Sequence, residues 1–343
     1  MSKKNITKQR FYLQFPTQLF LFIVLIFLGF SCGNEGEDKI TGKENPPPLV
    51  AKAHVDPPAF NADSAYYFLK TQCDFGPRNP GSKAHEKCSS WLENKLNSYG
   101  ATIYPQRTTL TTYDQKKWLC KNIIGEFNPD AKERILLMAH WDSRPMAEHE
   151  STGSERNKPI LGANDGASGV GILLEVARNI AIQKPGIGID IFLNDLEDYG
   201  DPDGNVPDSW CLGTQYWSKN PHRPQYYAKY GILLDMVGAS GAVFPREGTS
   251  VDYARSVVDK VWNKAQQMGF GKYFIDVQTQ PTTDDHLYVN SNTSIPTIDI
   301  VHYDTKSRSY FPCHHKQCDD MTQIDKKTLE VVGKVLLELI YNE

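Results

Sequence analysis

The sequence predicts one α/β domain with a mostly parallel, twisted central sheet flanked by helices. Four short, continuous apolar runs between residues 134 and 301 are typical of strands that are buried on both faces. Helix-length amphipathic stretches separate these runs, and such alternation favours a parallel sheet with helical crossovers. No internal repeat or shift in composition follows residue 60, so we expect a single domain.

The helices and strands are expected in a regular order along this domain. Residues 64–73 predict an amphipathic helix with Ser64 as its N-cap, and residues 83–99 predict a second helix that Gly100 ends. The predicted strands are the apolar runs at residues 134–139, 187–193, 232–234 and 295–301. Further helices are predicted over residues 166–181, 251–268 and 326–341.

The composition is that of an ordinary globular protein. The chain has 343 residues, of which 40% are hydrophobic and 23% charged, so wholesale disorder, collagen-like repeats and a coiled coil are excluded. Residues 1–32 hold four basic residues and no acid; the remainder has 33 basic and 41 acidic residues, a net charge of −8. Such a body would repel nucleic acid and anionic lipid, so neither is expected as a partner.

Residues 1–32 have the features of a secretion signal. A basic start precedes an apolar run at residues 19–30, which is shorter than the roughly 20 residues that a membrane-spanning helix needs. The small residues before Cys32 and the polar run after it resemble a bacterial lipobox, although Gly29 stands where Leu is usual. We therefore expect lipidation of Cys32 rather than simple cleavage. The folded domain would then be anchored by lipid alone to a bacterial membrane, the outer one, in the periplasm or at the cell surface.

Residues 33–60 predict a tether between this signal and a domain that spans residues 61–343. The segment is polar, has no apolar periodicity and contains three consecutive prolines at 46–48, which favour an extended spacer.

Export would permit disulfide bonds among the cysteines of the domain. Six cysteines follow Cys32, and they allow fifteen complete pairings, among which the sequence does not choose. None of them lies in a C-x-x-C pair, so a thiolate zinc site is not expected. These residues are Cys73, Cys88, Cys120, Cys211, Cys313 and Cys318.

Acidic residues and histidines follow the predicted strands where each strand ends. The carboxyl ends of parallel strands form the ligand crevice of open α/β sheets, so these side chains should meet at one edge. Taken singly, Asp165 could be a helix cap, Glu197 and Asp198 a solvated turn, and His315 a surface residue. Together they offer the imidazole nitrogen and carboxylate oxygens that zinc prefers, with a coordination position left open. The segments are His140–Asp142, Gly162–Asp165, Asp195–Asp198, Asp235, Asp284–His286 and His314–His315.

In this order, the segments resemble the zinc-dependent exopeptidases, a family that includes zinc aminopeptidases and animal-type glutaminyl cyclases. The resemblance extends from about residue 62 to the C-terminus. Within the family, three stretches are similar to the cyclase branch: the Leu-Leu-Asp-Met-Val-Gly-Ala run around Asp235, the Asp284-Asp285-His286 triplet where aminopeptidases more commonly carry Ser-Asp-His, and residues 212–217.

The resemblance implies a role for each site residue. Asp165, Asp198 and His315 would hold one zinc ion, and Glu197 would act as general acid and base. Asp235 and Asp284 would form a hydrogen-bonded acid network beside the metal. One zinc ion is expected and a second stays open. Positions that could belong to a second metal or support the first are His140, Asp142 and Asp299.

Three departures from the animal cyclases concern the pocket. Asp198 stands where those enzymes carry Glu, and Asp299 stands where they carry His. His314 replaces the Trp that precedes their metal-binding His, so other aromatic residues must form the pocket wall. The candidates are Trp141, Trp210, Trp217 and Tyr310.

The resemblance also implies a reaction. A glutaminyl-peptide cyclotransferase converts the N-terminal Gln of peptides or proteins to pyroglutamate and releases ammonia. The alternatives are a zinc aminopeptidase built from the same residues and a catalytically silent binding protein on the same scaffold. For the cyclase we expect a monomer whose partners are peptides that begin with Gln.

Overall fold

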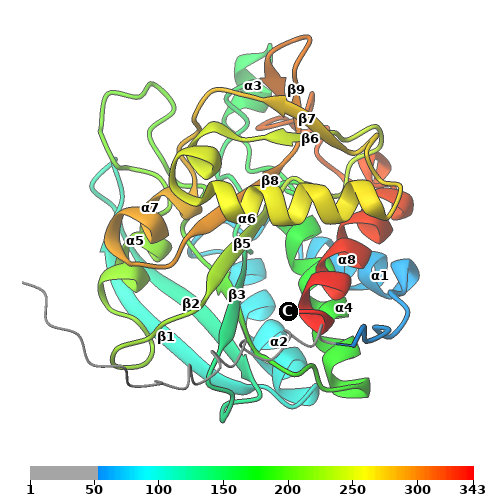
Figure 1. The fold of residues 1–343 in the computed structure, drawn as a ribbon. Coiled ribbons are helices and arrows are strands. Elements are labelled where there is room, and N and C mark those ends of the chain that lie inside the picture. Colours follow the sequence, from blue (N-terminus) through cyan, green and yellow to red (C-terminus); the bar gives the residue numbers. More distant parts are fainter. Residues whose placement is uncertain (1–52) are drawn as a thin grey trace, which may run out of the picture. The chain divides into compact units, whose positions relative to one another are not determined.

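The computed structural model describes residues 53–343 (Figure 1). The predicted signal, its Cys32 and most of the predicted tether therefore lie outside the described residues. Among residues 53–343, no helix is both long enough and apolar enough to cross a membrane.

The described part of the chain alternates between helices and strands. The helices are α1 (Ala62–Asp74), α2 (Lys83–Ser98), α3 (Gly153–Arg156), α4 (Ala167–Ile182), α5 (Leu212–Lys219), α6 (Gly248–Gln267), α7 (Asp285–Asn292), α8 (Lys326–Tyr341) and the short 3₁₀ helix η1 (Met321–Gln323). The strands are β1 (Thr102–Thr111), β2 (Lys117–Phe127), β3 (Arg134–His140), β4 (Gly188–Asn194), β5 (Tyr230–Asp235), β6 (Phe244–Arg246), β7 (Phe274–Gln278), β8 (Thr297–Val301), β9 (Tyr303–Asp304) and β10 (Ser309–Tyr310).

The central sheet has six strands in the order β1-β2-β4-β3-β5-β8. The four strands β4, β3, β5 and β8 are parallel, whereas β1 and β2 form an antiparallel extension at one edge. The predicted fold class, a mostly parallel sheet flanked by helices, is confirmed. The hairpin β1–β2 was not predicted, because β1 carries no continuous apolar run and alternates between exposed and half-buried residues.

Helices cover the sheet on both faces (Figure 1). Successive residues of a strand point to opposite faces, so Ile135 and Leu137 of β3 pack into the larger core with α1, α2, α4, α6 and α8. Leu136 and Met138 pack into a smaller core that includes residues of α5 and α7. Every residue of β3 and β4 is buried, as their continuous apolar sequences require.

The first helix begins earlier than the sequence predicts. Asn61, rather than Ser64, is the N-cap of α1, because its side-chain oxygen accepts a hydrogen bond from the Ser64 backbone N–H at 3.0 Å. The two residues compete for the same role, and the asparagine lies one turn upstream.

The last part of the predicted tether is packed against the domain. The backbone of Val55 makes two hydrogen bonds with the Asn342 side chain, and Phe60 is 93% buried against α8 close to Gly333. The folded domain therefore begins upstream of residue 61, where the sequence analysis placed its boundary.

Candidate metal centre and active site

The carboxyl edge of the parallel strands opens into a cavity of about 220 Å³. The elements that reach it are far apart in sequence, as expected for the ligand crevice of an open α/β sheet. Trp210 and Tyr310 contribute aromatic surface to its wall. Its ionisable lining residues are Glu148, His149, Asp165, Glu197, Asp198, Asp235, Asp284, His314 and His315.

Asp165, Asp198 and His315 lie together in this cavity. One nitrogen or oxygen atom from each lies within 4.8 Å of the others. The Nε2 of His315 is 3.1 Å from Oδ1 of Asp198 and 3.8 Å from Oδ2 of Asp165. All three side chains are buried, and Oδ2 of both aspartates has no hydrogen-bond partner among the described residues.

This set of atoms fits zinc. Two buried carboxylate oxygens that lack a donor, and an imidazole nitrogen beside them, are the ligands that Zn²⁺ takes, and three protein ligands leave a position for substrate. Without a cation, the carboxylates destabilise each other, since burial and then the Asp165 charge raise the pKa of Asp198 to about 6.

Glu148 orients the imidazole of His315. Its Oε1 lies 2.8 Å from His315 Nδ1, which directs Nε2 towards the two aspartates. Burial alone would raise the pKa of Glu148, but His315 and the buried Arg144 together lower it to about 2. Arg144, which pairs with Glu148, also donates to the backbone carbonyls of Asp198 and Gly200, so it links the carboxylate that orients His315 to the loop that carries Asp198.

Asp319 and Asp142 hold the loops that carry the aspartate ligands. The carboxylate of Asp319 accepts hydrogen bonds from the backbone N–H groups of Asn164 (2.8 Å) and Asp165 (3.1 Å). The carboxylate of Asp142 does the same for Glu197 (3.3 Å) and Asp198 (3.2 Å). Asp142 therefore fixes the backbone of the loop that carries Glu197 and Asp198.

A second group of donor atoms overlaps the first. His140, at the end of β3, places its Nε2 3.1 Å from Asp165 Oδ1 and 3.3 Å from Asp235 Oδ1. These three residues also meet within 4.8 Å. The two triads thus share Asp165, which is the arrangement that a pair of neighbouring ions would use.

Glu197 reaches the cavity beside these ligands. Its carboxylate lies within 4.8 Å of ligand atoms of Cys211 and Asp284, and the Cys211 thiol donates to its Oε1 at 3.4 Å. Burial, followed by the charges of Asp198 and Asp284, raises the pKa of Glu197 well above its usual value, despite the opposing effect of His140. A carboxyl group with a raised pKa is suited to exchange protons near neutral pH.

Asp235 and Asp284 do not form the hydrogen-bonded pair that the resemblance implied. In the described part of the chain, Asp235 pairs with His140 and makes no hydrogen bond to Asp284, although both carboxylates line the cavity. Burial and then the charge of Asp235 raise the pKa of Asp284 to about 7. Asp299 belongs to a group with Asp284 and His286 and not to the His140 triad, so it does not stand at the second metal position.

Two of the four candidate aromatic residues line the cavity. Trp210 stacks on His315 with ring centroids 5.8 Å apart, and Tyr310 contacts the cavity on another side. Trp141 and Trp217 are fully buried elsewhere, so the prediction was wrong for both. Trp141 stacks on His85, and Trp217 packs against Phe192 in the smaller core.

Glu148, Arg144 and Asp319 support the candidate ligands through contacts that the sequence did not reveal. They contact ligands whose positions lie at least 50 residues away along the chain, so no local pattern reveals them. The one available signal was the place of Asp319, four residues after the proposed ligand His315.

Residues 122–340 match the model of peptidase family M28, which covers more than half of the chain. The chain belongs to peptidase family M28. The resemblance to zinc-dependent exopeptidases is therefore confirmed, and the chain is an enzyme of this family.

Solved structures of M28-type enzymes are similar over most of the chain. A zinc-dependent exopeptidase from Parabacteroides distasonis is 49% identical, with a TM-score of 0.83 over 84% of this chain and 100% of its own. A glutaminyl cyclase from Tannerella forsythia is 50% identical, with a TM-score of 0.82 over 83% of this chain and 100% of its own.

A curated relative carries the name of the same activity. The glutaminyl-peptide cyclotransferase of Gloydius blomhoffii is 23% identical over 292 residues, which are 76% of this chain and 75% of the relative. The predicted similarity to the cyclase branch of the family is thereby confirmed, and the zinc-dependent neighbours agree with the donor set in the cavity.

Proposed function

We propose that this enzyme is a glutaminyl-peptide cyclotransferase that converts N-terminal Gln to pyroglutamate with release of ammonia. The observation that carries the proposal is the 50% identity with the Tannerella forsythia glutaminyl cyclase over its whole length. The cavity supports it, because the acids and histidines that the reaction needs line one small chamber. A volume of about 220 Å³ suits the end of a peptide rather than a folded domain.

Asp165, Asp198 and His315 would hold one zinc ion in this proposal. The bound ion would supply a Lewis acid that polarises the γ-carbonyl of the substrate glutamine. Glu148, Asp142 and Asp319 would keep the three ligands in place through the contacts described above.

Glu197 would move the proton. The α-amine of the substrate attacks its own γ-amide carbon, so a carbon–nitrogen bond forms and closes a five-membered lactam. Glu197 accepts a proton from that amine and returns it to the amide nitrogen, which leaves as ammonia. Because the attack is intramolecular, correct placement of the substrate removes much of the entropic part of the barrier.

Other side chains would position the substrate. Asp284 has a carboxylate oxygen within 4.8 Å of the Glu197 carboxylate and would line the path of the amine. Trp210 and Tyr310 would cover the apolar part of the glutamine side chain and exclude water, which would otherwise compete with the amine as nucleophile.

A zinc aminopeptidase is the second candidate, favoured by one specific observation. The His140–Asp165–Asp235 triad shares a ligand with the first triad, as two-metal aminopeptidases require. The same Glu197 would then activate a water molecule against the first peptide bond.

Two peptides separate the candidates. We expect mass spectrometry to show the loss of one molecule of ammonia from a peptide that begins with Gln, and no cleavage of a matched peptide that begins with Leu. Release of free Leu at a comparable rate would contradict the cyclase proposal and support the aminopeptidase.

We also propose that the enzyme is exported and anchored by lipid at Cys32. The basic start, the apolar run and the cysteine in residues 1–32 support this proposal. The intact chain should incorporate labelled palmitate in a bacterial host and fractionate with membranes, whereas Cys32→Ser should do neither. Equal labelling of the two would contradict the anchor.

A further inference from the structure

The segment that presents His315 has no regular secondary structure of its own. Residues 311–320 form a series of turns between β10 and η1, held by hydrogen bonds such as Lys316 N–H to Cys313 O (3.0 Å) and Asp319 N–H to Lys316 O (3.1 Å). His315 itself has φ +53°, a left-handed conformation that residues with a side chain rarely adopt. Contacts other than the local backbone hydrogen bonds must therefore hold the His315 backbone in this conformation and thereby fix its imidazole.

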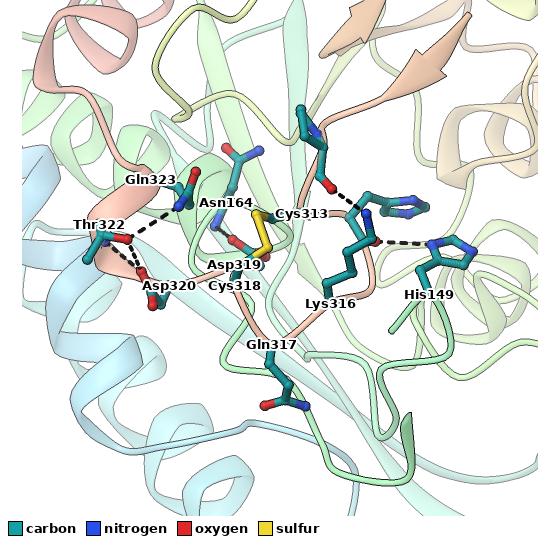
Figure 2. Close-up of a disulfide and its surroundings, with 12 residues drawn as sticks. His149, Asn164, Cys313, Lys316, Gln317, Cys318, Asp319, Asp320, Thr322 and Gln323 are labelled. Carbon is teal, nitrogen blue, oxygen red and sulfur yellow. Dashed lines mark hydrogen bonds between the residues drawn. A yellow bond between two sulfur atoms is a disulfide. The ribbon is translucent and has the colours of Figure 1, made fainter. Parts of the chain in front are cut away.

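A disulfide closes this segment into a small ring. Cys313 and Cys318, five positions apart, are bonded to each other (Figure 2). His315 lies between them in the sequence and is therefore part of the closed ring. Without this bond, residues 313–318 would be a six-residue loop held by short turns and by hydrogen bonds to the segment of His149. The bond therefore removes much of the conformational freedom around His315.

The residue after the ring, Asp319, supports a second proposed ligand, Asp165. Asp319 follows Cys318, and its carboxylate accepts a hydrogen bond from the backbone N–H of Asn164 (Figure 2). It accepts a second one from the backbone N–H of Asp165. His315 and Asp165 are 150 positions apart in sequence. One short segment nevertheless holds both, because it contains His315 and also Asp319, which binds the backbone of Asp165. A displacement of the ring would disturb two of the three metal ligands together.

The ring is also docked on the loop that carries Glu148. The His149 backbone N–H donates to His315 O (3.3 Å), His149 Nδ1 lies 3.0 Å from His314 O, and the Gln317 backbone N–H donates to Glu150 (2.9 Å). These contacts form only when the backbone of residues 314–317 has the conformation of the closed ring.

The disulfide reaches the surface at Cys318, whereas its other half, Cys313, and the remaining described cysteines are buried. Cys318 is exposed, while Cys73, Cys88, Cys120 and Cys211 are free thiols buried in the domain. Thiol exchange needs access to a sulfur atom. Among residues 53–343, reduction would therefore act at one bond only.

We propose that the Cys313–Cys318 disulfide is a positioning element for the metal centre, and that its reduction weakens zinc binding. The inference rests on the zinc site of the proposed function. In the reduction, a phosphine attacks Cys318 Sγ and the Cys313 sulfur leaves as a thiolate. Water then hydrolyses the phosphorus–sulfur bond and releases Cys318 as a thiol. The protein gains two electrons and two protons, and the phosphine is oxidised to its oxide.

The test measures zinc affinity rather than turnover. The purified full chain is prepared metal-free in three forms: oxidised, reduced with a phosphine that is then removed under anaerobic conditions, and reoxidised. A double variant, Cys313→Ser with Cys318→Ser, is treated in the same three ways. Competition with a fluorescent zinc chelator gives the dissociation constant of each form, and far-UV circular dichroism of each metal-free form shows that it is folded.

We expect the dissociation constant for zinc to rise about 10- to 100-fold on reduction of the wild type, and to return to its first value on reoxidation. The double variant should bind as weakly as the reduced wild type and should not respond to the phosphine. Equal affinity of folded oxidised and reduced wild type, or tight binding by the double variant, would overturn the inference while leaving the zinc site intact. Failure of the oxidised wild type to bind zinc would instead overturn the proposed function together with the inference.

Discussion

Glu197 and Asp198 are adjacent in sequence but point to different partners. Asp198 lies 3.1 Å from the imidazole of His315, whereas Glu197 lies near Cys211 and Asp284. Asp142 fixes both, because its two oxygens accept their backbone N–H groups. One carboxylate can therefore bind a metal while its neighbour carries a proton.

Replacement of Glu197 by Gln should lower kcat by about 100-fold or more, because the amide cannot exchange the proton. Zinc content, measured by mass spectrometry of the metal, should stay at the wild-type level, since Glu197 is not a ligand of the first triad. Glu155→Gln, a change at an exposed acid on α3, is the matched control and should leave kcat unchanged. Turnover of Glu197→Gln near the wild-type rate would remove this residue from the mechanism.

Replacement of Glu148 by Gln should weaken zinc binding about 10- to 100-fold, because the neutral amide orients and polarises His315 less well. The dissociation constant from chelator competition is the measurement. Glu155→Gln on α3 is the control, since its side chain pairs with Lys158 and contacts neither a proposed ligand nor the disulfide ring. Unchanged affinity in Glu148→Gln would show that the carboxylate does not support the metal.

At the scale of the elements, the strands and helices that build the site were largely predictable. β3, β4, β5 and β8 have continuous apolar sequences because both of their faces are buried, and each begins and ends within two residues of its predicted bounds. α8 has the predicted bounds. β1 escaped prediction because an edge strand that alternates between exposed and half-buried residues carries a weaker pattern. β2 escaped it because polar residues interrupt its apolar sequence, although residues 120–127 are buried.

Helix α6 depends on a buried carboxylate at its start. Glu247 is the N-cap, and its oxygens accept the backbone N–H groups of Thr249 and Ser250 at 2.7 Å and lie 3.0 Å from His286 Nε2. Burial would raise the pKa of Glu247, but these bonds lower it to about 2.

The depressed pKa of Glu247 predicts a pH-dependent contribution to stability. The carboxylate stabilises the fold fully above its unfolded pKa of about 4.5, and this contribution is lost as the pH falls from there towards 2. Glu247→Gln should therefore lower the free energy of unfolding by about 2 to 3 kcal/mol at pH 7. Urea unfolding at pH 7 and at pH 3 measures it, and the difference between variant and wild type should shrink at the lower pH. A difference that is constant with pH would contradict the proposed charge.

At the scale of the whole molecule, the site is a product of the fold rather than of any one segment. The order of acids and histidines along the sequence was enough to predict that one sheet edge brings together five of them, because parallel strands end on the same side. These residues are Asp165, Glu197, Asp198, Asp235 and His315. Three features of the site could not be predicted, because they depend on contacts between residues far apart in sequence. They are the bonds from Asp319 to the loop of Asp165, the pairing of Asp235 with His140, and the burial of Trp141 away from the cavity.

Removal of the metal should lower the melting temperature of the enzyme. The ion binds only the folded chain, since its ligands are dispersed over 150 positions, so a zinc concentration of about 1,000 times the dissociation constant contributes about 4 kcal/mol. For a domain of this size, that corresponds to a shift of roughly 10 °C. Calorimetry of the zinc-loaded and the chelator-treated enzyme measures the shift, and readdition of zinc should reverse it. Identical melting curves would mean that no ion is held in the folded state.

The central claim is that Asp165, Asp198 and His315 bind zinc. Anomalous X-ray scattering, recorded on both sides of the zinc absorption edge from crystals grown without added metal, tests it most directly. We predict an anomalous peak within coordination distance of all three side chains, about 2.0 to 2.2 Å from the ligand atoms. A map without a peak between these residues, or with zinc bound elsewhere, would contradict the account.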